Sequence, residues 1–338
     1  MNLFETKISS EDSMEISKVI ESGNIGFGPN VGLFEDSFKN FSKKENNVAC
    51  NSASAAAFMI FSYLKDAYGV CDVYTTSLGF TSPAWCVKHF GHNLIFVDVQ
   101  EDLQFSSDHY RQVRINSKNK VVVMPVLYGG VSNIKNFNMF GDELIVVDSA
   151  HCVTPTIESD FIFFSFHPYK PICTSDGGMI STDDREATEY FKNYRNFGRI
   201  NIDSSYNIET GGFKFYMNNL NATIGITQIK RYTENLEKRK INYNNLASEC
   251  ELLRHDKDSS FYFATAFLKN ANDIIAQIGV YKNYPMLHKM KFYNNGVILP
   301  ELEAKFDTIL NLPIHQNLNS STLDNLKSIL NKERKNVL

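Results

Sequence analysis

Short apolar runs alternate with longer amphipathic stretches between about residues 46 and 182. The runs are rich in valine, isoleucine and phenylalanine, and they occupy 48–50, 73–75, 94–99, 121–127, 144–147, 161–166 and 179–181. Continuous apolar runs of this length are typical of strands buried on both faces of a mainly parallel sheet. Because helix-sized segments such as 55–68 and 83–89 separate the runs, the pattern predicts an α/β fold with a doubly wound, seven-stranded sheet.

The pattern of the chain changes after the last of these runs. Helical periodicity recurs at 184–196, at 217–250 and near 321–332. Weaker strand runs lie at 261–267 and 274–280. In the longest predicted helix, charged side chains between Lys230 and Arg239 indicate a solvated face. We expect a large domain over residues 1–216 and a smaller α+β C-terminal domain over residues 217–338.

Composition narrows the class of protein. A chain of 338 residues is long enough for two domains, and 43% hydrophobic and 21% charged residues are the fractions of a globular protein. The net charge of −4 argues against nucleic-acid binding and against a polybasic membrane anchor. The apolar runs are too short to span a bilayer, and the first residues lack the features of a signal peptide. We therefore expect a cytoplasmic protein with no membrane partner.

The six cysteines are scattered along the chain and include no C-x-x-C pair. Metal sites and iron–sulfur clusters need closely spaced thiolates. The spacing favours reduced, mostly buried thiols, so we predict no metal site.

Polar and aromatic residues follow several of the predicted strands at the point where each strand ends. They are Ser52, Ser54, Ser77, Phe80, Asp148, His151, Ser165, His167 and Lys170. Because ligands of doubly wound sheets bind beyond the carboxyl ends of the strands, these residues are candidates for one site.

Three of these positions have a chemistry of their own, and each also has a simpler explanation. The small-residue turn 51–57 leads from a strand into a helix and can bind an anion, or it is a plain tight junction. Asp148 ends a buried strand, where its carboxylate needs a cationic or hydrogen-bonding partner or caps a helix. Lys170 follows an aromatic strand and is either an amine nucleophile in a desolvated cleft or a surface lysine.

Together, a phosphate cradle, an acid for a pyridinium nitrogen and a lysine for a Schiff base are the parts of a pyridoxal-phosphate (PLP) enzyme. The chain resembles the DegT/StrS-type sugar aminotransferases, a PLP family of fold type I, nearly from end to end. The similar segments are 26–31, 34–35, 51–57, 147–151, 165–170, 195–198, 217–225 and 312–315. The most specific of them is the Ser165-Phe166-His167-x-x-Lys170 motif followed by Gly177-Gly178.

The resemblance implies a role for each site residue. Lys170 forms the Schiff base with PLP and shuttles the proton between the substrate and the cofactor, and Asp148 pairs with the pyridinium nitrogen. Phe80 stacks on the cofactor ring, and His151 approaches its hydroxyl. The phosphate is held by Ser54, the Ala55 backbone and Ser165. The family also implies a homodimer whose active sites are shared between subunits.

The chain departs from the family pattern in the block that reaches the partner subunit's phosphate. Lys214 stands where asparagine is usual, and Tyr216 stands where arginine is common. A lysine can still meet a phosphate as a point charge, so we include Lys214 among the cofactor-binding residues. Phe27, Tyr216 and His288 are our candidates for substrate contact.

The resemblance implies an aminotransferase that alternates between the PLP and PMP (pyridoxamine phosphate) forms of its cofactor. The amino donor is expected to be an amino acid, in the first instance glutamate, and the acceptor a keto-sugar, nucleotide-linked in the leading hypothesis. Lys214 and Tyr216 leave open a small, phosphorylated ketone as acceptor. Dehydratase relatives replace the lysine or bind an iron–sulfur cluster, which Lys170 and the cysteine positions disfavour. A catalytically idle regulatory relative would lack the lysine or the acid, and this chain has both.

Overall fold

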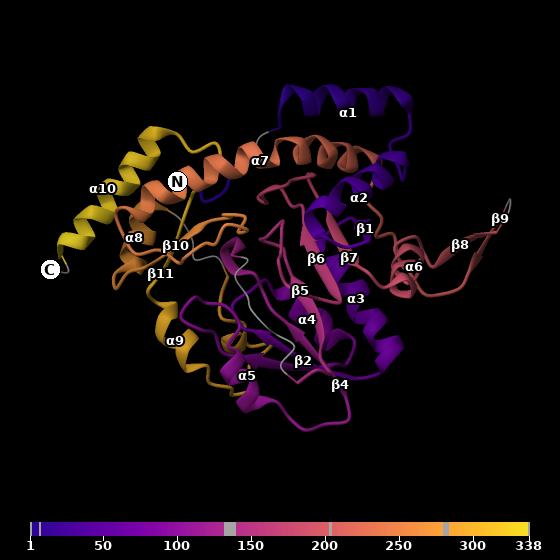
Figure 1. Ribbon diagram of the computed structural model, residues 1–338, viewed down its shortest axis with the longest axis horizontal. Coiled ribbons are helices and arrows are strands. Elements are labelled where there is room, and N and C mark those ends of the chain that lie inside the picture. Colours follow the sequence, from indigo (N-terminus) through magenta and orange to yellow (C-terminus); the bar gives the residue numbers. More distant parts are fainter. Residues whose placement is uncertain (1, 7, 132–139, 203–204, 280–283, 337–338) are drawn as a thin grey trace.

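A seven-stranded sheet forms the centre of the molecule (Figure 1). The computed structural model describes residues 2–6, 8–131, 140–202, 205–279 and 284–336. The strands are β1 (Asn46–Cys50), β2 (Cys71–Thr76), β3 (Asn93–Val97), β4 (Lys120–Met124), β5 (Leu144–Asp148), β6 (Phe161–Ser165) and β7 (Gly178–Thr182). Their order is β1-β7-β6-β5-β4-β2-β3, and only β7 runs antiparallel to its neighbours. The predicted α/β fold with a mainly parallel seven-stranded sheet is therefore confirmed.

Helices cover both faces of this sheet. They are α2 (Pro29–Ser42), α3 (Ala53–Tyr68), α4 (Thr81–His89), α5 (Ser107–Val113), α6 (Arg185–Tyr194) and α7 (Asn219–Ala247). A further helix, α1 (Ser10–Ser22), packs on α7. Adjacent strand residues contribute to two different apolar cores: Phe163 packs in the core that contains α3, whereas Phe164 packs in the core that contains α2. Burial on both faces explains why the strands have continuous apolar runs.

The C-terminal part contains a small antiparallel pair, β10 (Ala264–Phe267) with β11 (Ile309–Leu312). Around it lie α8 (Ala271–Ile278), α9 (Pro300–Phe306), α10 (Ser320–Asn336) and a 3-10 turn, η2 (Leu287–Lys289). A hairpin of β8 (Arg199–Ile202) and β9 (Ser205–Ile208) projects from the body of the molecule (Figure 1). The boundary at residues 216 and 217 falls just before α7, and the division into two domains stays a prediction.

The strand predicted at 274–280 is wrong. Residues 274–278 belong to α8, Gly279 caps its C-terminus, and Val280 lies outside the described residues. Ala271, Ile274 and Ile278 are buried at helical spacing, so the apolar run is the inner face of a helix. The strand that pairs with β10 is instead β11, which the sequence pattern did not predict.

The long helix α7 links the two parts of the chain. Near its start it packs against α1 and α2, and Arg231 forms an ion pair with the buried Asp12 of α1 at 2.6 Å. The predicted solvated face is correct for Lys238 but wrong for Arg239, which is 2% exposed. Among the described residues, no helix is both long and apolar enough to cross a membrane.

Candidate active site

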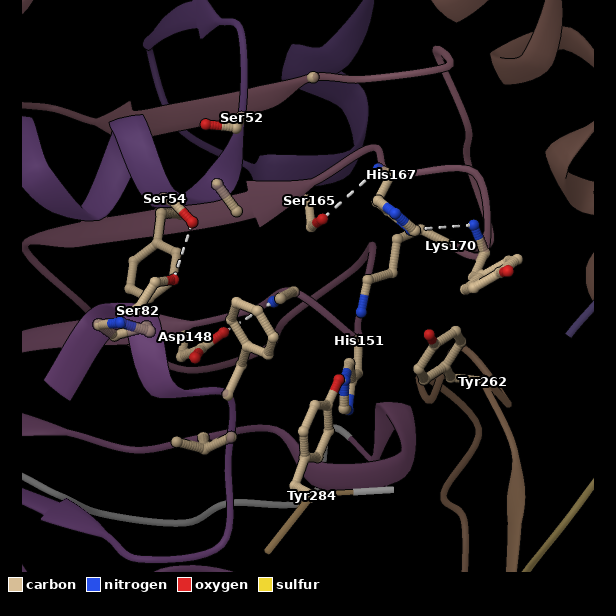
Figure 2. Close-up of a pocket in the computed structure, with 18 of the residues that line it drawn as sticks. Ser52, Ser54, Ser82, Asp148, His151, Ser165, His167, Lys170, Tyr262 and Tyr284 are labelled. Carbon is tan, nitrogen blue, oxygen red and sulfur yellow. Dashed lines mark hydrogen bonds between the residues drawn. The ribbon is translucent and has the colours of Figure 1, made fainter. Parts of the chain in front are cut away.

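A cavity of about 370 Å³ opens at the carboxyl-terminal edge of the central sheet (Figure 2). Eight of the nine candidates at the strand ends line it, all except Ser77: Ser52, Ser54, Phe80, Asp148, His151, Ser165, His167 and Lys170. They come from the segments that follow β1, β2, β5 and β6, whose carboxyl ends lie at one edge of the sheet. In Figure 2, Ser54, Ser82 and Asp148 lie on one side of the cavity and Lys170 with His151 on the other.

Asp148, the last residue of β5, is buried in the floor of the cavity. One carboxylate oxygen accepts a hydrogen bond from the Ala150 N–H at 3.0 Å. Burial raises the pKa of the carboxyl to about 6, although the Ala150 N–H and the positive charge of Lys170 lower it in part. A carboxylate held this way in an apolar site is suited to bind a protonated nitrogen.

Lys170 ends a tight turn after β6, where its N–H donates to the His167 carbonyl oxygen at 2.9 Å. Its side chain enters the cavity, and Nζ lies 4.5 Å from the centre of the Tyr262 ring. Burial lowers the pKa of the amine to about 7, and the charge of Asp148 opposes this shift. A large fraction of Lys170 is therefore neutral near physiological pH, which is the reactive form of an amine.

His151 is buried between two polar partners. Its Nδ1 accepts a hydrogen bond from the Gly129 N–H at 3.3 Å, so the ring proton lies on Nε2, 2.7 Å from the Tyr284 hydroxyl. Burial, with the nearby charge of Lys170, lowers the histidine pKa well below its usual range. His151 is therefore a neutral hydrogen-bond donor at the edge of the cavity.

The N-terminus of α3 provides the features of an anion cradle. Ser52 caps the helix by accepting from the Ala55 N–H at 3.1 Å, and the Ser54 hydroxyl donates to that of Ser82 at 2.9 Å. A side chain at Gly178 would clash with the Ser52 backbone, so glycine permits β7 to approach this turn. The free N–H groups and the dipole of a helix start favour a phosphate.

The donors and acids of this cavity fit PLP, the cofactor that the sequence led us to expect. The cavity offers hydroxyls at a helix start for a phosphate, a buried acid for a ring nitrogen and an amine for an aldehyde. Ala55 lies behind this surface: its N–H is already occupied by Ser52, so its predicted phosphate contact would replace that hydrogen bond.

Three predicted residues lie together outside the cavity. The Phe27 and Tyr216 rings meet edge to face at 5.5 Å, and Lys214 Nζ lies 5.6 Å from the centre of the Tyr216 ring. Phe27 and Lys214 are exposed. The single chain does not bring them to the cavity that it lines with Lys170, and their roles stay predictions.

His288 also lies outside the cavity, buried in η2. Its Nδ1 pairs with the Ser77 hydroxyl at 2.6 Å and its Nε2 with the Glu303 carboxylate at 3.1 Å. Both ring nitrogens are therefore engaged within the chain, and this placement does not support the predicted contact with substrate.

The sequence did not identify several residues that line the cavity: Phe4, Ser82, Tyr169, Tyr262 and Tyr284. Ser82 could have been found, because it lies in the first turn of α4, two residues after Phe80. The two C-terminal tyrosines reach the cavity through tertiary packing and carry no local signal in the sequence.

The chain is similar in sequence to known aminotransferases along most of its length. The sequence profile of the DegT/DnrJ/EryC1/StrS aminotransferase family matches residues 6–331. The spore coat polysaccharide biosynthesis protein SpsC of Bacillus subtilis is 30% identical over 257 residues, which are 69% of this chain and 64% of that protein. A Campylobacter jejuni UDP-4-amino-4,6-dideoxy-N-acetyl-beta-L-altrosamine transaminase is 24% identical, with 97% of each chain covered.

A solved structure has the same architecture over the full length. The PLP form of Spr1654, a putative sugar aminotransferase from Streptococcus pneumoniae, superposes with a TM-score of 0.88. The two sequences are 25% identical, and the match covers 100% of this chain and 99% of the other. The same protein has also been solved in a PMP form.

Proposed function

The chain belongs to the DegT/DnrJ/EryC1/StrS aminotransferase family, and we propose that it transfers an amino group from glutamate to a nucleotide-linked keto-sugar. Enzymes of this family depend on PLP. One observation carries the assignment of residues: Lys170 and Asp148 line the same cavity, and burial shifts the pKa of both. Matched shifts of an acid and a base in one cleft are typical of catalytic sites.

Each of the residues that line the cavity has a separate role in the proposed reaction. PLP supplies the electron sink that lets an amino group move between two carbon skeletons. Asp148 would hold a proton at the ring nitrogen, and Lys170, about half neutral at pH 7, would accept and return the proton of the substrate carbon. The Nε2 proton of His151, which now meets the Tyr284 hydroxyl, would have to leave that oxygen to reach the cofactor, while Ser54 and Ser165 would orient the phosphate.

The relatives favour a sugar acceptor. One is named for spore coat polysaccharide biosynthesis, and another is a UDP-sugar transaminase. A small phosphorylated ketone is the second candidate acceptor, since Lys214 adds a cation and Tyr216 removes one relative to the family pattern. An idle relative is disfavoured because the cavity contains both the lysine and the acid.

An exposed aromatic surface supports the homodimer. Large exposed apolar side chains lie on or beside the projecting β8–β9 hairpin. They are Phe27, Phe197, Phe213, Tyr206 and Ile208. Exposed clusters of large apolar side chains mark interaction surfaces, and a second copy of this chain is the partner that the family implies. The unpaired thiols of all six cysteines support a reducing, cytoplasmic location.

Half-reactions test the proposal directly. Glutamate should convert the PLP-loaded protein to its PMP form, which is seen as a change in the visible absorption band. The PMP protein is then offered keto-sugar nucleotides and small phosphorylated ketones in parallel. Return of the original band with a keto-sugar nucleotide supports the proposal, whereas return only with small ketones supports the second candidate. No spectral change with any donor would contradict both.

A further inference from the structure

One aromatic ring lies directly against the amine of Lys170. Its Nζ lies 4.5 Å from the centre of the Tyr262 ring, and Tyr262 is only 2% exposed. Within the described residues, Lys170 forms no ion pair with a carboxylate. The face of a tyrosine ring attracts a cation, so Tyr262 contacts a protonated Lys170 directly. The charge of Asp148 also favours this form, whereas His151, whose ring centre lies 4.5 Å from that of Tyr262, is neutral.

The backbone of Tyr262 is fixed on both sides. Its N–H donates to the Gly129 carbonyl oxygen at 3.0 Å, and its own carbonyl oxygen accepts from Arg239 Nη1 at 3.2 Å. Arg239 is itself buried in α7. These contacts fix the backbone from which the Tyr262 ring reaches Lys170.

A residue from the opposite end of the sequence covers this ring. Phe4 stacks on Tyr262 with ring centres 4.6 Å apart and an angle of 13° between planes. Phe4 also stacks on Tyr169, with ring centres 5.5 Å apart and an angle of 19° between the ring planes. Phe4, Tyr169 and Tyr262 form an aromatic wall along the cavity that contains Lys170.

We propose that the aromatic wall positions Lys170: Tyr262 holds the free ε-amine in the cavity, and Phe4 keeps water from it. The inference rests on the role of Lys170 in the proposed function, but it concerns the amine itself and can be measured without catalysis. Phe4 and Tyr262 are thus positioning residues, since they act on the reaction through Lys170.

Two physical effects then act on the amine in opposite directions. Exclusion of water disfavours the ammonium form, and the π-face of Tyr262 favours it. Loss of Phe4 should therefore raise the Lys170 pKa, because water reaches the amine. Replacement of Tyr262 by an apolar side chain of similar reach should lower the pKa, because burial is kept and the attraction is lost.

Competitive labelling with acetic anhydride measures both effects. The full-length, cofactor-free protein is labelled between about pH 5 and pH 10, and the rate at Lys170 is read by peptide mass spectrometry. We expect Phe4→Ala to raise the midpoint by about one pH unit. Tyr262→Leu should lower it by about half a unit, whereas Tyr262→Phe, which keeps the ring, should leave it unchanged.

An exposed pair with the same geometry provides the control. Lys88 Nζ lies 4.6 Å from the ring centre of Phe292, which is 57% exposed. Phe292→Ala should leave the Lys170 midpoint unchanged.

If Phe4→Ala does not fold, Phe4→Ser replaces it with the same expectation, and Phe4→Leu, which keeps the apolar cover, should match the wild type. The proposal would be overturned if the Lys170 midpoint stayed unchanged in the folded Phe4 variant and in Tyr262→Leu. A higher Lys170 midpoint in Tyr262→Leu would also overturn it.

Discussion

His151 Nε2 lies 2.7 Å from the Tyr284 hydroxyl oxygen, and the two rings stack at 5.4 Å. His151 follows the central strand β5, whereas Tyr284 belongs to the C-terminal part of the chain. The hydrogen bond therefore joins the sheet edge to a segment 133 residues away. Because Gly129 occupies Nδ1, this bond also fixes the ring proton on Nε2, next to the cavity.

Tyr284→Phe should destabilise the protein. The variant removes the acceptor of a buried N–H while keeping the stacked ring, and an unsatisfied buried donor costs about 1–3 kcal/mol. Urea denaturation of the cofactor-free protein measures the change. Tyr68→Phe, at an exposed position, is the matched control and should have the wild-type stability. Equal stability of Tyr284→Phe and wild type would mean that another group satisfies His151.

Lys170 should be the lysine that bonds to PLP. Borohydride reduction of the loaded protein followed by peptide mapping is expected to tag Lys170, whose amine lies in the cavity. Lys170→Ala should keep the fold, measured by circular dichroism, and lose transamination, because no other described lysine lines the cavity. A tag on another lysine would contradict the assignment.

Asp148→Asn should slow turnover by about 10²–10³-fold while the cofactor remains bound. The amide is neutral and does not stabilise a protonated ring nitrogen, but Ser54 and Ser165 still line the phosphate end of the cavity. Steady-state kinetics and the bound PLP content separate the two effects. Near-normal turnover at full occupancy would show that Asp148 does not have this role.

The same variant should be more stable than the wild type when the cofactor is absent, in a pH-dependent way. Burial raises the Asp148 pKa from 3.8 to about 6, which corresponds to about 3 kcal/mol. The native state therefore contains a costly buried charge above about pH 6, and this cost disappears below about pH 4. The advantage of Asp148→Asn should be full at pH 8 and vanish as the pH falls through this range.

Urea denaturation at both ends of the range measures this difference. Asp36→Asn removes a carboxylate that is 71% exposed, and it should change stability by less than about 0.5 kcal/mol at either pH. An Asp148→Asn advantage that is the same at pH 8 and pH 4 would mean that the charge of Asp148 is not its cause.

The sequence predicts the parts of the site that follow strands of one sheet. Asp148 and Lys170 end or follow neighbouring strands, so the topology alone brings them to one edge. Tyr262 and Tyr284 could not be predicted, because they reach the cavity only through packing of the C-terminal part. The strand predicted at 274–280 failed because a short apolar run fits either period, and only burial against β11 shows that it is helical.

The last prediction concerns Lys214, which the single chain leaves exposed beside Tyr216. In the proposed homodimer, Lys214 reaches the phosphate or the anionic substrate in the partner's cavity. A cation next to a dianion strengthens binding, so Lys214→Ala should weaken retention of the cofactor or lower activity toward anionic acceptors.

Mixing two variants, under conditions in which each alone is inactive, tests whether the sites are shared. In a heterodimer of Lys170→Ala and Lys214→Ala subunits, one site carries both defects and the other carries neither, because its lysines come from different subunits. Random exchange should therefore restore about a quarter of the wild-type activity. Each variant alone is the control and must be inactive. If no activity returns after subunit exchange has been verified by native mass spectrometry, Lys214 acts within its own subunit, since both sites of the heterodimer would then be damaged.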